Sequence, residues 1–252
     1  MAKQPGRRQR TRKALLIGSL LFFPVTLYYF SPALIIQSAA AGVVNGSLIV
    51  FASMFLASLF FGRLWCGWAC PAAALQEIST AVNNGPFKTG RRDRIKWLIW
   101  TPWIALIAFM ALQAGGYHQV NFFYETEQGL SVTNWPGYIV YYVVTGLFLA
   151  LAWLAGRRAA CHTLCWMAPF MILGRALRNA VRWPALRLVA DPARCSDCKT
   201  CTTNCPMSLD VNGLVHAGSM EHRECILCGT CVDGCAKDAI RYSFSAGTAK
   251  TC

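Results

Sequence analysis

Four long apolar segments, separated by polar loops, lie within the first 155 residues of the chain. They span residues 14–36, 46–61, 97–114 and 138–155, and none of them contains Asp, Glu, Lys or Arg. A helix needs about 20 apolar residues to cross a hydrocarbon core about 30 Å thick. The second segment is the shortest, but apolar residues continue it as far as Trp65. The pattern therefore predicts four membrane-spanning helices.

The apolar segments belong to a repeat. Each pair of them is followed by a Cys-x-x-x-Cys pair, a half-apolar segment and a basic stretch. We expect the half-apolar segments, 72–82 and 169–181, to form helices at the membrane surface, because Pro71 and Pro169 suit the first turn of a helix. The chain turns polar from Asp191 onward. The predicted fold is mainly α: a four-helix transmembrane bundle of two repeated helical hairpins, followed by a small α+β domain.

Basic residues predict how these helices are oriented. The 252 residues include 24 Lys and Arg against 11 Asp and Glu, which gives a net charge of +13. The loops 37–45 and 115–137 contain no Lys or Arg, and such residues tend to stay on the cytoplasmic side of a span. We therefore expect both termini in the cytoplasm. No nucleic-acid-binding motif accompanies the charge, so it indicates topology and contact with anionic lipid, with no nucleic-acid partner.

Thirteen cysteines indicate metal or redox chemistry, because the predicted topology places them on the cytoplasmic side, where thiols stay reduced. Eight of them form two Cys-x-x-Cys-x-x-Cys-x-x-x-Cys runs. In bacterial two-cluster ferredoxins with this spacing, three thiolates of a run bind one 4Fe–4S cluster and the fourth binds the other. A zinc ribbon would leave thiolates unused. We expect one cluster at Cys195, Cys198, Cys201 and Cys235, and a second at Cys225, Cys228, Cys231 and Cys205.

The two runs define a separate cytoplasmic domain. The stretches RLVAD, before the first run, and AIRYSF, after the second, predict strands that close this domain as a hairpin. The predicted parts are a basic N-terminal segment (1–13), a four-span membrane domain (14–182), a two-cluster ferredoxin domain (183–245) and a tail (246–252).

Four further cysteines, Cys66 with Cys70 and Cys161 with Cys165, occupy equivalent places in the two halves of the repeat. If an axis along the membrane normal relates the halves, four thiolates converge under the bundle, enough for a third iron–sulfur cluster. The alternatives are a thiol–disulfide couple, transient copper binding and simple packing. His162, inside the second pair, could replace a cysteine ligand, but a hydrogen-bonding or a surface histidine is favoured.

These motifs together resemble the NapH-type membrane ferredoxins, which include the quinol dehydrogenase membrane component of periplasmic nitrate reductase systems. Related modules occur in the NosR regulator of nitrous oxide reduction and in a polyferredoxin involved in copper handling. The resemblance covers about residues 14–244. Within WCGWACP, Cys66 and Cys70 match the first membrane motif. Cys161 and Cys165 match the second, although no proline follows them directly.

The resemblance implies a membrane-bound iron–sulfur protein that passes electrons between the quinone pool, or a cytoplasmic donor, and a redox partner subunit. Tyr117 and His118, at the outer end of the third span, are candidate quinone-binding residues. One alternative function is an assembly factor that reduces copper or the thiols of a partner, and another is a redox-sensing regulator. Uncharged spans disfavour a pump, and no P-loop or GxGxxG motif indicates a nucleotide site.

Overall fold

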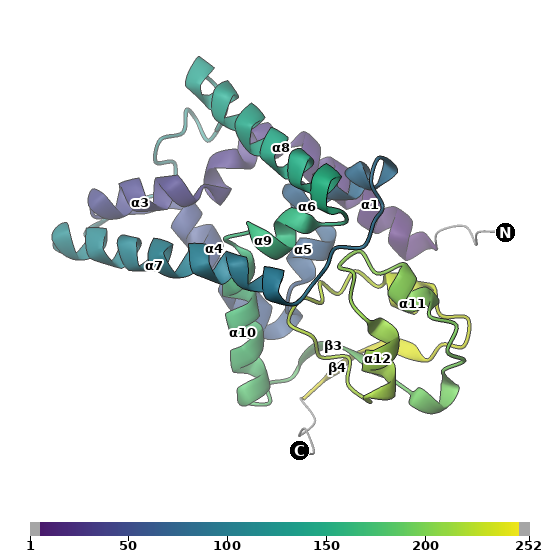
Figure 1. Ribbon diagram of the computed structural model, residues 1–252. Coiled ribbons are helices and arrows are strands. Elements are labelled where there is room, and N and C mark those ends of the chain that lie inside the picture. Colours follow the sequence, from purple (N-terminus) through teal and green to yellow (C-terminus); the bar gives the residue numbers. More distant parts are fainter. Residues whose placement is uncertain (1–5, 247–252) are drawn as a thin grey trace.

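The computed structural model describes residues 6–246, so nearly all of the predicted tail lies outside the described residues. The fold is mainly helical, as predicted, with a small domain at its C-terminal end (Figure 1). Two long helices, α7 (Ile95–Gln113) and α8 (Trp135–Ala155), extend away from that domain. The short 3-10 helix η3 (Arg91–Arg94) leads into α7.

The first predicted span, 14–36, is not one continuous helix. Helix α1 (Arg7–Leu21) is followed by the short α2 (Phe23–Thr26) and the 3-10 helix η1 (Leu27–Phe30), and the chain bends by 60° between α1 and this second part. Pro24, in the first turn of α2, explains the break. A proline has no N–H to donate, and its ring clashes with the preceding turn of a continuing helix.

A second proline begins the next helix, α3 (Pro32–Ala40), where the Ser31 hydroxyl accepts a hydrogen bond from a backbone N–H. Helix α4 (Gly46–Phe61) is capped in the same way by the side chain of Asn45. These caps satisfy backbone donors that have no partner in the first turn. The chain therefore enters α3 and α4 at defined residues.

The described part of the chain contains two helices, α7 and α8, that are long and apolar enough to cross a membrane. The bent pair made of α1 and residues 23–30 is a third if it counts as one span. Helix α4 is apolar but has only 16 residues. The protein is therefore a membrane protein by the length and composition of its helices, while the four-span bundle stays a prediction.

Two loops without basic residues meet on one side of the molecule. Strand β1 (Val43–Asn45) pairs in parallel with β2 (Gln119–Asn121). The hydrophobic pattern gave no sign of either strand, because three residues are too few for a periodicity. The pairing ties the loop 37–45 to the loop 115–137, which agrees with the prediction that both lie on the same face of the membrane.

Short helices follow α4 and α8 in the same order, so the repeat is visible in the structure (Figure 1). The predicted surface segments 72–82 and 169–181 are indeed largely helical. The elements after α4 are α5 (Leu64–Trp68), α6 (Pro71–Ile78) and η2 (Ser79–Ala81), and those after α8 are α9 (Ala159–Thr163) and α10 (Ala168–Ala180).

The small domain is closed by a hairpin, as RLVAD and AIRYSF predicted. Strand β3 (Ala185–Ala190) pairs antiparallel with β4 (Ile240–Ser245) over six residue pairs. Between them lie four short helices: η4 (Pro192–Arg194), α11 (Thr200–Thr203), α12 (Val211–His216) and α13 (Thr230–Asp233).

Carboxylates of the small domain fasten it to the helical part through ion pairs. Glu221 binds Arg175 of α10 at 2.6 Å, and Asp233 binds Arg8 of α1 at 2.9 Å. The arginines of α10 therefore face the small domain. The position of this helix at the membrane surface stays a prediction. The basic N-terminal segment likewise docks onto the small domain where it enters α1.

Candidate metal centres

The two Cys-x-x-x-Cys pairs meet at one cavity of about 200 Å³, and all four of their side chains line it. Cys66 lies in α5 and Cys161 in α9, while Cys70 and Cys165 follow these short helices within two residues. Three of the four are buried and Cys165 is half-buried. We refer to these four residues as the quartet. The structure brings together thiols that the sequence related only through the repeat.

Glycine turns place both pairs under the ends of membrane helices. Gly62 ends α4 with a φ of 55°, and Gly156 ends α8 with a φ of 98°. Residues with a side chain rarely adopt such positive φ values, so glycine is the usual residue at this turn. Each turn redirects the chain into the short helix that carries Cys66 or Cys161.

The thiols of the quartet are close enough to affect one another's ionisation. Burial is the largest influence on Cys70 and raises its pKa, and the other three thiols raise it further. Burial, Cys161 and Cys66 raise the pKa of Cys165 to about 12, although Arg63 acts in the opposite direction. Four thiolates therefore require added positive charge to coexist in this cavity. A cluster or a soft metal ion supplies that charge, and four convergent thiols are a suitable donor set for either.

Buried arginines flank the quartet. Arg63 lines the same cavity and is fully buried. Arg158, also buried, donates from Nη1 to the carbonyl oxygen of Cys66 at 2.9 Å and from Nη2 to Oε2 of Glu77 at 2.7 Å. Burial alone would raise the pKa of Glu77, but Arg158 and Arg12 lower it to about 2, so this carboxylate stays ionised.

A second set of cysteines surrounds a small cavity of about 30 Å³ in the ferredoxin-like domain. Its lining includes Cys225, Cys228 and Cys231 of the second run and Cys205 of the first. Burial raises the pKa of Cys205 to about 11, and the neighbouring Cys228 and Cys225 also raise it. The fourth cysteine of the first run therefore lies with the second run, which is the arrangement that crossed ligation requires.

The other four ferredoxin-type cysteines are more accessible. Cys198 is exposed, and Cys195, Cys201 and Cys235 are half-buried. The side chain of Asn212 donates to Sγ of Cys195 at 3.7 Å. The first of the two expected clusters would thus lie nearer the solvent than the second.

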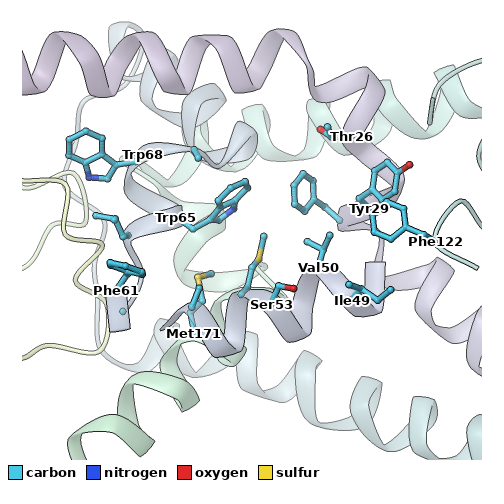
Figure 2. A pocket seen from close by; sticks show the side chains of 16 residues that line it. Thr26, Tyr29, Ile49, Val50, Ser53, Phe61, Trp65, Trp68, Phe122 and Met171 are labelled. Carbon is cyan, nitrogen blue, oxygen red and sulfur yellow. The ribbon is translucent and has the colours of Figure 1, made fainter. Parts of the chain in front are cut away.

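An apolar cavity of about 830 Å³ adjoins the quartet (Figure 2). Figure 2 shows Tyr29 and Phe122 at one end of it and Trp68 at the other, with Trp65 and Met171 between. The Sδ atom of Met171, which lines this cavity, lies 3.9 Å from Sγ of Cys66. Only the side chain of Met171 would therefore separate a ligand that contacts it from Cys66. Its volume suits a small organic molecule.

Two segments of the chain match known iron–sulfur domains. Residues 46–88, which include Cys66 and Cys70, match the 4Fe-4S binding domain. Residues 194–240, which include both ferredoxin-type runs, match the 4Fe-4S dicluster domain. The chain is similar to 4Fe–4S-binding ferredoxin-type proteins over both segments.

The relatives of this chain are distant. An uncharacterized protein of Methanocaldococcus jannaschii is 24% identical over 83% of this chain and 83% of its own length. The ferredoxin-type protein NapH of Haemophilus influenzae is 22% identical over 90% of this chain and 78% of its own length. The nitrogen fixation protein FixG of Rhizobium meliloti is 24% identical over 72% of this chain, which spans 38% of FixG. No solved structure matches. The resemblance to the NapH-type proteins is therefore a distant homology.

The remaining candidate residues lie elsewhere. His162 is buried, its Nδ1 lies 2.6 Å from Oδ1 of Asp93, and its ring stacks on Phe87, in keeping with a hydrogen-bonding rather than a surface histidine. Tyr117 and His118 are both exposed and do not line any of the three cavities described above. The suggested quinone site at these two residues thus lies outside these three cavities.

The contact between the quartet and the ferredoxin-like domain was not predicted from the sequence. The indole N–H of Trp68 donates to the carbonyl oxygen of Leu227 at 3.1 Å, and Gly67 packs against Ile226 and Cys228. Arg63 donates to Glu224 at 2.6 Å. The one sequence signal was the small residue within WCGW, since a glycine in a short helix often marks a close approach of another segment.

Proposed function

We propose that this protein passes electrons between the quinone pool, or a cytoplasmic donor, and a redox partner subunit, with a third iron–sulfur cluster at the quartet. The observation that carries the proposal is the convergence of Cys66, Cys70, Cys161 and Cys165 on one cavity beside the ferredoxin-like domain. The match of residues 46–88 to a 4Fe-4S binding domain supports it. Such clusters, when bound, supply one-electron transfer, and the protein supplies their spacing and surroundings.

The cysteines would be arranged in a sequence from solvent to membrane. Cys195, Cys198, Cys201 and Cys235 would hold the outer cluster, because Cys198 is exposed. Cys205, Cys225, Cys228 and Cys231 would hold the second around their shared cavity. The quartet follows, because Gly67, next to Cys66, packs against the backbone of Cys228.

The proposed setting is the inner membrane of a bacterium, with four spans and both termini in the cytoplasm. Helices α7 and α8, the bent pair at the N-terminus and the apolar α4 would provide the spans. The pairing of β1 with β2 joins the two loops without Lys or Arg, which fits their placement together on the outer side.

A quinone, as one source or acceptor of electrons, would fit the apolar cavity of Figure 2 better than Tyr117 and His118. Support comes from its position, since Met171 lines the cavity and contacts Cys66. The ring of a quinone in this cavity would lie close to the quartet, and the apolar lining would accommodate its isoprenoid tail.

A second candidate function is copper handling by an assembly factor. The contact between the Cys66 thiol and the Met171 thioether favours it, because soft sulfur ligands of both kinds select Cu(I). In that case the quartet would bind copper, and the ferredoxin-like domain would supply the electrons that keep it reduced.

The deciding experiment counts iron and acid-labile sulfide in anaerobically purified protein. The same count is made on a variant in which the four quartet cysteines are replaced by serine. The proposal predicts about twelve iron atoms in the wild type and about eight in the variant, because each cubane holds four. About eight in both would reject the third cluster. Copper bound by the wild type and lost in the variant would then favour the second candidate.

A further inference from the structure

Arg63, a cationic residue, lines the same cavity as the quartet. The residue directly follows the glycine turn after α4, and its side chain is 0% exposed. Burying a cation is unfavourable unless its charge is balanced and its N–H groups find acceptors. What surrounds Arg63 therefore constrains what the cavity holds.

One side of the guanidinium is fully engaged. Nη1 donates to Oε2 of Glu224 at 2.6 Å and to the carbonyl oxygen of Arg223 at 3.3 Å. Glu224 also binds a second cation, because Nζ of Lys96 lies 2.7 and 2.6 Å from its two carboxylate oxygens. Two buried cations thus share one buried carboxylate.

The second group of charges near the quartet likewise consists of two cations and one carboxylate. Glu77 is shared by Arg12 and Arg158, both buried. The third carboxylate, Asp93, is hydrogen-bonded to His162. Without counting His162, four cations face three carboxylates, so at least one positive charge beside the quartet lacks a counter-charge among the described residues.

The other side of the guanidinium is free of partners. Nε and Nη2 of Arg63 are buried and have no hydrogen-bond acceptor within the described part of the chain. Burial lowers the pKa of Arg63, but Glu224 raises it above its usual value. Cys66 and Cys165 also raise it, which places these thiols within electrostatic reach. The unpaired donors and the excess charge thus both call for an anion at the quartet.

We propose that Arg63 donates Nε–H and Nη2–H hydrogen bonds to sulfur atoms of an anionic centre at the quartet and thereby raises that centre's reduction potential. The inference rests on the proposed third cluster. Four thiolates outweigh the positive charge of a cubane core, so the centre is anionic and becomes more so on reduction. A nearby cation and hydrogen bonds to sulfur stabilise the reduced form more than the oxidised form. A neutral disulfide or four neutral thiols would leave the charge of Arg63 unbalanced.

Arg63→Gln and Arg63→Lys test the proposal in the purified full-length protein. The measurement is an EPR-monitored redox titration of the signal that disappears when the quartet cysteines are replaced. Arg63→Gln removes the charge, so the midpoint potential of this signal should become more negative, with an unchanged iron content. Arg63→Lys keeps the charge but loses the paired donors, and its potential should lie between those of the wild type and Arg63→Gln.

Arg178→Gln is the matched control, because Arg178 is also fully buried, pairs with a glutamate and has an unpaired Nε, but does not line the quartet cavity. It should leave the potential of the quartet signal unchanged. If the quartet signal is present in both Arg63 variants and its midpoint potential is unchanged, the proposed role of Arg63 is overturned, while the third cluster stands. If Arg63→Gln fails to assemble, the Arg63→Lys titration decides. Absence of the signal from the wild type would overturn the third cluster and this inference together.

Discussion

Gly67 and Ile226 are in backbone contact, although 159 residues separate them in the chain. A Cβ atom on Gly67 would overlap with the carbonyl oxygen of Ile226 and would lie 3.5 Å from the backbone nitrogen of Cys228. Gly67 follows Cys66 of the quartet, and Ile226 lies between two cysteines of the second run. Glycine at this position therefore lets two cysteine-bearing segments approach as closely as their backbones allow.

Gly67→Ala should push the ferredoxin-like domain away from the quartet. The added methyl group has no space, and overpacking of this kind costs about 1–3 kcal/mol. We expect a less stable domain contact and slower electron redistribution between the ferredoxin clusters and the quartet, measured by freeze-quench EPR after rapid reduction. Gly18→Ala in α1 is the control, because its Cβ atom meets nothing within 4 Å. Equal rates in both variants would contradict a path through Gly67.

Cys205→Ser should remove the cluster of the second run, although Cys205 belongs to the first run. The reason is its position in the cavity that Cys225, Cys228 and Cys231 line. We expect a loss of up to about four iron atoms and of one of the two ferredoxin EPR signals. The matched variant Cys235→Ser should remove the other signal. If both variants abolished the same signal, the crossed assignment would be wrong.

Glu221→Gln should make domain docking less dependent on pH. Burial alone would raise the pKa of Glu221, but Arg175, Arg178 and Arg187 lower it from 4.5 to about 2. Between these values the unfolded chain binds a proton that the folded chain does not, so the free energy of unfolding decreases as the pH falls from about 5 towards 2. The wild type should therefore unfold at a higher temperature than Glu221→Gln at pH 7, and the difference between the two midpoints should become smaller at acidic pH.

The control for this prediction is Asp191→Asn. Asp191 pairs only loosely with Arg194, at 3.9 Å, and both side chains are more than half exposed. Exposed pairs of this kind contribute little to stability. A pH-dependent difference as large for this variant as for Glu221→Gln would show that the arginines around Glu221 are not the cause.

The sequence predicted those features that depend on residues close together in the chain. Cysteine spacing indicated the ferredoxin-like domain, and the stretches RLVAD and AIRYSF indicated the strands of its hairpin, β3 and β4. Long apolar runs similarly indicated α7 and α8. The break near Pro24 was missed, because an apolar run of sufficient length predicts a span whether or not a proline interrupts its hydrogen bonds.

The contacts that build the quartet's surroundings could not be read from the chain. Glu224 lies 161 residues from Arg63 and 128 from Lys96. No local periodicity relates residues so far apart, and many arginines were available as partners. The equivalence of the cysteine pairs was predicted because it is a repeat. Arg63 and Arg158 belong to that repeat, since each stands three residues before a pair, but their carboxylate partners, Glu224 and Glu77, do not occupy equivalent places.

Ser53→Phe tests the apolar cavity of Figure 2 as the place where a quinone binds. Ser53 lines the cavity from α4, so a phenyl ring there would occupy space that a quinone ring needs. We expect slower reduction of the clusters by a quinol, while reduction by dithionite and the iron content stay at wild-type values. Ala52→Phe is the control, because Ala52 is exposed and does not line the cavity.

The comparison of the two variants separates a specific site from a general disturbance of α4. Slower quinol-driven reduction in Ser53→Phe alone would support binding beside Met171 and Cys66. Equal slowing in both variants would indicate that a bulky side chain on this helix disturbs the protein wherever it points. Unchanged rates in both would place the quinone elsewhere, and the same assay on His118→Ala would then test the outer loop.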